Sequence, residues 1–439
     1  MNRRKFLLSL SAIILMANNS NAMELPKSGW RGKTKTAEEV EEEALLNILN
    51  EESKPEDFAY IKEVKETTLD SFKMNEENIQ NHLDFMKNLN EGNLNEAKTI
   101  AEKLVFSESD DEMANIVGNV YFGEILKIEG DYERALYYHD KAFFKLKDNE
   151  DYLIEYIILS RFLINTFVLN NEFDKALKYI DYIKRNAKRI KHANILVVNA
   201  IENEILIYIE KKEFMLTGNK IKLLTAALRN AFGLESYEFQ FSYYYRLKLK
   251  NAEGKRKSGF QAIKNIQELL IPRFKKNNLY GYKFIDIYFE MADFLFKFEK
   301  YKESNFFLKE NEKLIHNLFP NETSINIIGE LYKNYARNYK KMNDFKTAHD
   351  YLNKAKEIFQ DIYGPMGDKT LDINLLIGFL YYEEGDVQTA VKILQENYKI
   401  LISKYGESNI KTKILRSNIR YIQKKYEIEE AENSFENNY

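Results

Sequence analysis

A short phrase of small, polar and apolar residues recurs along the chain about every 42 residues. In each copy a small or polar pair precedes an aromatic or aliphatic residue, and a small residue follows three positions later. The clearest copies are Gly130-Asp131-Tyr132 with Ala135, Asn171-Glu172-Phe173 with Ala176, Asn343-Asp344-Phe345 with Ala348, and Gly385-Asp386-Val387 with Ala390. With the weaker copies, the third residue of the phrase falls at positions 94, 132, 173, 214, 259, 301, 345 and 387. A fixed period of this length is typical of stacked repeats, so the sequence predicts a solenoid.

Residues on both sides of the phrase recur at helical spacing. Around Tyr132 they are Val120, Phe122, Gly123 and Leu126 before the phrase, and Ala135, Leu136, His139, Ala142 and Phe143 after it. The whole chain has only 17 Gly and 5 Pro, fewer than the turns of an all-β or α/β fold require. The predicted fold class is therefore all-α: an α-solenoid of about eight stacked antiparallel helical hairpins over residues 74–426.

Small residues mark where the two helices of a hairpin cross closely. They lie nine positions before the third residue of the phrase, and three and ten positions after it, as in Gly123, Ala135 and Ala142, and again in Ala336, Ala348 and Ala355. In this pattern the sequence resembles tetratricopeptide repeats, of the 42-residue kind found in kinesin light chains. Tyr363-Gly364-Pro365 and Tyr405-Gly406-Glu407 resemble the links between such repeats. The resemblance implies a superhelix in which the first helix of each hairpin, helix A, lines the concave surface.

The repeat placed at position 259 departs from the pattern. Its phrase is Ser258-Gly259 with Ala262, and the polar run from Asn251 to Ser258 precedes it. We interpret this run as an insertion that forms either a longer loop or a hinge between two parts of the stack.

The N-terminal residues have the pattern of a bacterial secretory signal peptide. Basic residues precede an apolar run from Phe6 to Ala17, and Ser20-Asn21-Ala22 has small residues at the positions that a signal peptidase reads. Residues 1–22 are predicted to be this signal, so the mature chain is expected in the periplasm or outside the cell. Arg3-Arg4 suits the twin-arginine route and the apolar run suits the general secretory route, and both stay open.

Two further segments flank the repeats. Residues 23–73 are predicted to be a linker and a helical N-terminal lead-in, because Thr36-Ala37-Glu38-Glu39 has a capping-box pattern. This lead-in would cover the apolar end of the first repeat. Residues 427–439 are polar and are predicted to be a C-terminal tail.

Composition excludes several classes of function. The 65 Lys and Arg residues are balanced by 68 Asp and Glu residues, whereas a nucleic-acid-binding protein would show a basic domain or stripe. The chain has no Cys, so it has neither disulfides nor thiolate metal sites. No segment after the signal is apolar enough to cross a membrane, so no membrane span is expected in the mature chain.

Motifs for catalysis or cofactor binding are absent from the sequence. Its five His residues are never within four positions of one another, and it has no HExxH, glycine-rich phosphate loop or G-x-S-x-G pattern. His139 falls where the family has a core aromatic residue, so we interpret it as a packed helix-B residue. We therefore expect no catalytic residue, no cofactor and no metal site.

Candidate binding residues come from the positions that point inward in tetratricopeptide repeats, twelve and eight before the third residue of the phrase. They are Val120 and Glu124, Arg161 and Asn165, Glu202 and Leu206, Phe289 and Asp293, Lys333 and Arg337, and Leu375 and Phe379. Arg161 with Asn165 is suited to a peptide main chain or carboxylate. Lys333, Arg337 and Lys340 lie on one helical face and are suited to an acidic segment or a C-terminal carboxylate. Phe379 and Tyr382 would add an apolar floor.

The function predicted from these features is that of an exported, non-catalytic tetratricopeptide-type scaffold. Its concave groove would bind a protein or peptide partner, which a groove of this kind holds through side-chain pockets and main-chain hydrogen bonds. Two alternatives stay open: a secreted effector or surface protein that acts on a host, and an enzyme or enzyme subunit with an unrecognised site. Since one fold supports many functions, the partner itself is the observation that would discriminate among them.

Overall fold

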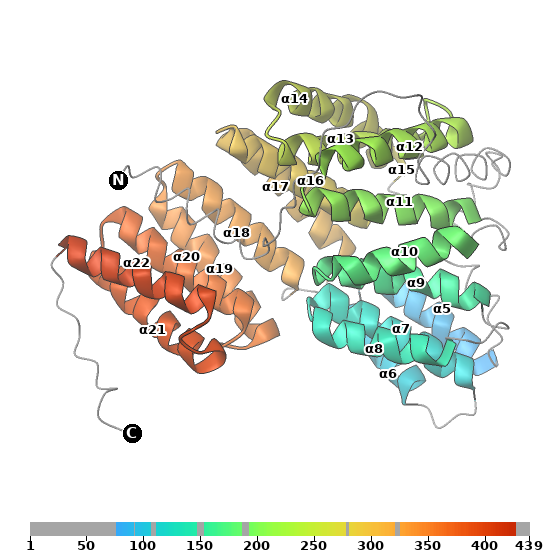
Figure 1. Cartoon of the computed structure of the whole chain (residues 1–439), viewed down its shortest axis with the longest axis horizontal. Coiled ribbons are helices and arrows are strands. Elements are labelled where there is room, and N and C mark those ends of the chain that lie inside the picture. The colour runs from blue at the N-terminus through green and yellow to red at the C-terminus, as the bar shows by residue number, and fades with distance from the viewer. Residues whose placement is uncertain are drawn as a thin grey trace, which may run out of the picture. The chain divides into compact units, whose positions relative to one another are not determined.

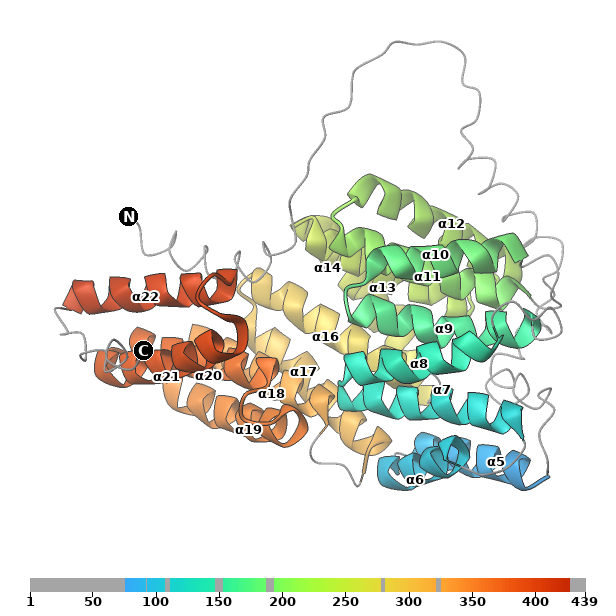
Figure 2. The ribbon, with the colours of Figure 1, turned by 60° about the horizontal axis from the view of Figure 1, so that its bottom comes forward.

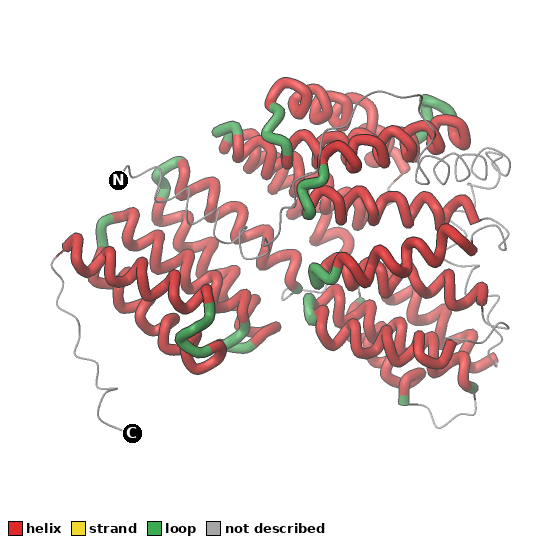
Figure 3. Tube along the Cα trace, in the orientation of Figure 1, coloured by secondary structure: helices red, strands yellow, loops and turns green. Residues whose placement is uncertain are grey.

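The computed structural model describes residues 76–91, 93–106, 111–146, 153–186, 193–277, 281–320 and 325–426. Every secondary-structure element in these ranges is a helix (Figures 1 and 3). The predicted all-α fold of stacked helical hairpins is therefore confirmed. The predicted signal peptide, the lead-in before residue 76 and the C-terminal tail lie outside the described residues.

Most helices pair into antiparallel hairpins, in which helix A precedes helix B. The pairs are α5 (Glu76–Glu91) with α6 (Leu94–Val105), α7 (Glu112–Glu129) with α8 (Tyr132–Leu146), α9 (Leu153–Leu169) with α10 (Phe173–Asn186), α11 (Ala193–Glu210) with α12 (Phe214–Phe232), α13 (Tyr237–Ala252) with α14 (Arg256–Asn265), α16 (Gly281–Lys297) with α17 (Tyr301–Leu318), α18 (Asn326–Lys341) with α19 (Phe345–Tyr363), and α20 (Asp368–Glu384) with α21 (Val387–Tyr405). A last helix, α22 (Ile410–Tyr426), follows.

The chain forms two compact units, which meet in sequence between Ile373 and Asn374, within α20. The larger unit holds the described helices from α5 to α19. In it, the hairpins from α5–α6 to α11–α12 lie one above another in the order of the sequence (Figure 2). The smaller unit holds the rest of α20 with α21 and α22.

The turn between helix A and helix B explains the recurring phrase. The residue two positions before helix B has a positive φ in every hairpin whose turn is described: Gly130, Asn171, Lys212, Gly254, Glu299, Asn343 and Gly385. The next residue closes the turn, as where the Asp131 N–H donates to the Leu126 carbonyl oxygen at 2.8 Å. This bond and the left-handed residue form a Schellman motif at the end of helix A. Glycine and asparagine recur there because they tolerate the left-handed region.

The same geometry corrects the interpretation of residues 251–258. Gly254 has a φ of 66° and α14 begins at Arg256, so the phrase of this repeat is Gly254-Lys255-Arg256 with Gly259. Its third residue is at 256 rather than 259. Asn251 belongs to α13 and is buried, so no polar insertion is present.

The extra length of this repeat lies later, within its second helix. From Arg256 to Asn277 the chain is helical throughout, but residues Ile266–Leu270 (η3) form a π-helical turn between α14 and α15 (Ile271–Asn277). A π turn takes up more residues than the same length of α-helix, while Ile266 and Leu270 stay buried. This accounts for a longer repeat without a loop.

Small residues pack at the helix crossings, as the sequence predicted for Gly123, Ala135 and Ala142. A Cβ atom added to Gly123 would lie 2.4 Å from the His139 ring, and one added to Gly259 would lie 2.0 Å from the Phe294 ring. Ala135 and Ala142 are fully buried. His139 is also fully buried, with its ring nitrogens 3.3 Å from the Val120 carbonyl oxygen and 3.1 Å from the Thr166 hydroxyl. It is therefore a packed helix-B residue, as the sequence predicted.

We expect Gly118→Ala to lower the free energy of unfolding by about 1–3 kcal/mol, the usual cost of overpacking. A Cβ atom at Gly118 would lie 2.6 Å from the Leu104 Cβ and 2.8 Å from backbone atoms of Leu104 and Val105. Relief requires α6 and α7 to move apart, because backbone atoms cannot rotate away. Urea denaturation monitored by circular dichroism measures the change.

Gly218→Ala is the matched control for this prediction. Gly218 lies within α12 and has no neighbouring atom within 4 Å of the added Cβ. The same substitution there should raise stability by about 0.5–1 kcal/mol, since alanine is the better helix former. A stabilising effect at Gly118 would contradict the close packing of α6 on α7.

The larger unit curves towards its A helices. Lys283 of α16 contacts Glu202 of α11 at 2.6 Å, two repeats away and past α13. Farther apart in sequence, the Tyr363 hydroxyl at the end of α19 donates to the Gly130 carbonyl oxygen at 3.3 Å and to the Asn326 side chain at 2.9 Å. Lys283 and Glu202 belong to A helices, and the A helices α7 and α18 also contact each other. The A helices therefore line the concave side of this unit.

Candidate functional site

A stripe of charged residues follows one face of α16 on this concave side. Its members, Lys283, Asp286, Glu290, Asp293 and Lys297, are spaced by alternating steps of three and four residues. Residues at these spacings share one face of a helix. We call these five residues and their partners on α11, α13 and α18 (Glu202, Lys248, Asn251 and Arg337) the inner polar face.

Glu290 joins α16 to α13. Its carboxylate accepts hydrogen bonds from the Lys248 ammonium group at 3.1 Å and from the Asn251 amide at 2.5 Å. Burial by itself would lower the pKa of Lys248, but the Glu290 carboxylate raises it well above its usual value. Lys248 therefore stays charged and its pairing with Glu290 is maintained.

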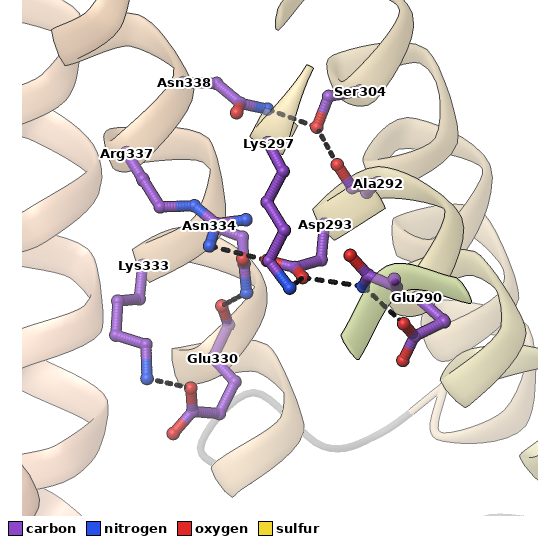
Figure 4. Close-up of polar contacts among 11 residues, drawn as sticks. Glu290, Ala292, Asp293, Lys297, Ser304, Glu330, Lys333, Asn334, Arg337 and Asn338 are labelled. Atoms are coloured by element: carbon purple, nitrogen blue, oxygen red, sulfur yellow. Dashed lines mark hydrogen bonds and ion pairs between the residues drawn. The ribbon is translucent and has the colours of Figure 1, made fainter. Parts of the chain in front are cut away.

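Asp293 joins three helices (Figure 4). Its carboxylate accepts from Asn251 at 2.9 Å and from Arg337 at 2.9 Å, and it pairs with Lys297 at 3.1 Å. Burial would raise the pKa of Asp293, but the charges of Arg337 and Lys297 and the bond from Asn251 lower it to about 2. The Arg337 guanidinium also lies 3.9 Å from the centre of the Phe296 ring, in cation–π geometry.

Glu330 of α18 forms a second cluster beside Arg337. Its carboxylate pairs with Lys333 on its own helix and with Lys369 of α20 at 3.0 Å. Burial would raise the pKa of Glu330, and the two lysines lower it below its usual value. Close by, a buried chain of hydrogen bonds fixes α18 on the α16–α17 hairpin: the Asn338 amide donates to the Ser304 hydroxyl, which donates to the Ala292 carbonyl oxygen (Figure 4).

Asp286 differs from the other members of the stripe. Its side chain is exposed to solvent, and within the described residues no hydrogen bond or ion pair reaches its carboxylate. Burial by the surrounding protein nevertheless raises its pKa, against the lowering effect of Lys248. Burial first, and then the charges of Glu330 and Asp286, raise the pKa of Tyr132 on α8.

The structure places the predicted basic residues of α18 on this surface, but in ion pairs. Lys333 pairs with Glu330 and Arg337 pairs with Asp293. All three predicted residues, Lys340 included, are half-buried. The expected basic patch is thus part of a mixed network of both signs of charge, since Asp293 and Glu330 neutralise two of its three members.

The other predicted residues lie elsewhere. Asn165 of α9 is half-buried, and the Arg161 side chain lies outside the described residues. Phe379 is only 8% exposed, so it belongs to the core of the smaller unit and offers little surface for an apolar floor. Tyr382 accepts a hydrogen bond from Lys425 at 3.1 Å, with its ring edge-on to Tyr426.

The inward positions counted from the phrase were right only in part. Glu202, Asp293, Lys333 and Arg337 lie on the inner surface, whereas Val120 is fully buried. Sequence reasoning missed Tyr244 and Lys248, because the phrase of their repeat was placed three residues too late. It also missed Asp286 and Glu290, although the three-four spacing of charges along residues 283–297 was a visible signal.

Within the described ranges, no group of three or more His, Asp and Glu side chains is arranged to hold a metal ion. None of the helices described is both long and apolar enough to cross a membrane. The inner polar face itself presents charged side chains of both signs and one amide, most of them joined by hydrogen bonds or ion pairs.

Comparisons with known proteins give structural likeness only. No protein-family profile matches the chain, and no curated protein sequence matches it. Among solved structures, the chain is similar to a Rap protein complexed with Competence and Sporulation Factor, with 14% identity over 70% of this chain and 81% of that chain and a TM-score of 0.46. It is also similar to the APC/C hetero-tetramer Cut9–Hcn1, with 12% identity over 82% of this chain and 86% of that chain and a TM-score of 0.28.

Proposed function

We propose that the protein is a non-catalytic helical-repeat scaffold that binds a protein or peptide partner on its inner polar face. The observation that carries the proposal is the continuity of this face. Side chains of α11, α13, α16 and α18 are tied from helix to helix by Lys283–Glu202, Asn251–Asp293 and Arg337–Asp293. Groups held in place before binding lose less entropy when a partner arrives.

The mixed charge of the face favours a polypeptide partner. Main-chain amides and side chains of both signs can hydrogen-bond to such a lining. A nucleic acid would instead require an excess of Lys and Arg along the surface, and here carboxylates match them. The roughly 42-residue spacing favours the longer tetratricopeptide repeats, of the kind found in kinesin light chains, as the relatives of these hairpins.

Lys333, Arg337 and Lys340 are proposed to bind an acidic side chain or a free carboxylate of the partner. Arg337 has the geometry for this role, because its guanidinium carries five N–H donors and is one-third exposed while it contacts Asp293. Arg161 with Asn165 is proposed as a second contact, and Tyr382 as a contact on the smaller unit. The signal pattern in residues 1–22 supports export of the mature chain, so the partner is expected in the periplasm or outside the cell. The alternative proposal is a secreted effector or surface protein that acts on a host.

The proposal is tested by in-cell crosslinking followed by fractionation. Cells that express the full wild-type chain should yield a processed form that begins at Met23. This form should be recovered outside the cytoplasm with a crosslinked partner. The double variant Lys333→Gln and Arg337→Gln should recover at least about tenfold less of it, since a charge-assisted bidentate contact is lost. Glutamine avoids placing a new negative charge beside Asp293.

Lys309→Gln with Lys346→Gln is the matched control, because both lysines are exposed on B helices, α17 and α19. Partner recovery should not change in this control. Equal recovery by all three proteins would exclude Lys333 and Arg337 as contacts. Recovery of unprocessed chain from the cytoplasm alone would exclude export.

A further inference from the structure

Within the inner polar face, Asp286 is the carboxylate for which the described chain provides no partner. The neighbouring charges are satisfied on both sides: Lys283 by Glu202 at 2.6 Å and Glu290 by Lys248 at 3.1 Å. The two lysines therefore already neutralise two carboxylates, and Asp286 is the excess negative charge of this part of the face.

Buried tyrosines of α13 surround the charge of Asp286. The pKa values of Tyr244 and Tyr245 are raised by burial first and by carboxylates that include Asp286. The Tyr245 ring already has the Lys283 ammonium group over it, at 5.8 Å from the ring centre. An incoming cation would therefore contact the exposed Asp286 carboxylate itself, through a charge-assisted hydrogen bond.

We propose that Asp286 binds a lysine or arginine side chain of the partner. This inference rests on the proposed function and names the chemistry of one contact in it. The position of Asp286 inside the stripe, not at its end, decides between a side chain and a chain terminus. Polar residues continue along α16 on both sides, at Lys283 and at Glu290 and Asp293, so a bound segment runs past Asp286 in both directions.

The combined expectation is a segment with charges of both signs. A basic side chain faces Asp286, and an acidic group faces Arg337 and Lys333. Such a segment matches the order of charges along the face, which raises specificity because a segment with the opposite order meets like charges.

The probe is an array of synthetic 12-residue peptides of random sequence, acetylated at the N-terminus and amidated at the C-terminus so that only side chains are charged. Each peptide that binds the full mature chain is resynthesised with norleucine for its lysine or citrulline for its arginine. We expect one basic position whose replacement weakens binding to wild type about tenfold. Asp286→Asn should bind the original peptide about tenfold more weakly and should bind the replaced peptide no differently from wild type. This is the coupling of two groups in contact.

Asp350→Asn is the control, since Asp350 is exposed on the B helix α19, and it should bind as wild type does. Asp286→Asn keeps the size of the side chain and breaks no described bond, so its thermal midpoint should not change. Binding peptides without a basic residue, or equal losses for the original and replaced peptides, would overturn the inference. If peptides bind and substitution of Arg337 weakens their binding but Asp286→Asn does not, the inference about Asp286 is wrong and the proposed function stands. If no peptide binds, or if neither residue matters, the proposed function fails with it.

Discussion

Replacing Glu204 with glutamine is expected to lower the free energy of unfolding by about 3–5 kcal/mol, the cost of breaking a buried ion pair. Glu204 of α11 lies between Lys184 of α10 and Lys220 of α12, with ammonium–carboxylate distances of 2.5 and 3.6 Å. All three side chains are at most 4% exposed. Glutamine removes the negative charge that both buried ammonium groups face, and water cannot reach them to replace it. Denaturant unfolding at neutral pH measures the change.

Glu77→Gln is the control for Glu204→Gln. Glu77 pairs with Lys103 at 3.0 Å, but the two side chains are 74% and 57% exposed. Solvent-exposed pairs contribute at most about 1 kcal/mol, so this variant should unfold nearly as wild type does. Similar effects of the two substitutions would show that the Glu204 cluster is not buried from water.

Acidification from pH 7 to pH 4 is expected to cost about 3 kcal/mol of stability through His139 alone. Burial lowers the pKa of His139 to about 4, against the Glu124 carboxylate, which raises it. In the unfolded chain a histidine has a pKa near 6.5. Between these two values the unfolded state binds more protons, so stability falls as the pH falls. At pH 5 the loss is about 2 kcal/mol.

His139→Phe isolates this contribution. Phenylalanine keeps a ring at the crossing of α7 and α8, next to Gly123, and does not titrate. Between pH 7 and pH 5, the free energy of unfolding of this variant should fall by about 2 kcal/mol less than that of wild type. This window lies above the range in which most carboxylates are protonated. Parallel curves for the two proteins would contradict the low pKa of His139.

The recurring phrase was predictable because local backbone geometry determines it. A helix that ends in a left-handed residue favours glycine or asparagine there, although Lys212 and Glu299 also occupy this position. Two helices that cross closely need small residues such as Gly123 and Ala135. These demands repeat in each hairpin. The sequence prediction placed the third residue of one phrase at 259 instead of 256. Lys255 and Arg256 stand there in place of the usual acidic and aromatic residues, and a π turn shifts the spacing that follows.

The inner polar face was only partly predictable. Position in a repeat shows which residues of helix A turn inward, and it identified Glu202, Asp293 and Arg337. It does not show which charges meet. Arg337 and Asp293 are in neighbouring repeats, and Lys283 and Glu202 are two repeats apart. Their pairing depends on how strongly the stack curves. That curvature is the sum of the small rotations of each repeat relative to the next.

The sequence by itself determined that this protein is a stack of helical hairpins and where most of the hairpins turn. Short-range steric rules and helical periodicity are sufficient for that, whereas the inward position of helix A was only implied by the resemblance to tetratricopeptide repeats. Only the tertiary structure decided that Lys333 and Arg337 of α18 are paired, that Phe379 is buried and that no side chain among the described residues bonds to Asp286. Those outcomes depend on distances between side chains far apart in the sequence, which no repeat pattern records.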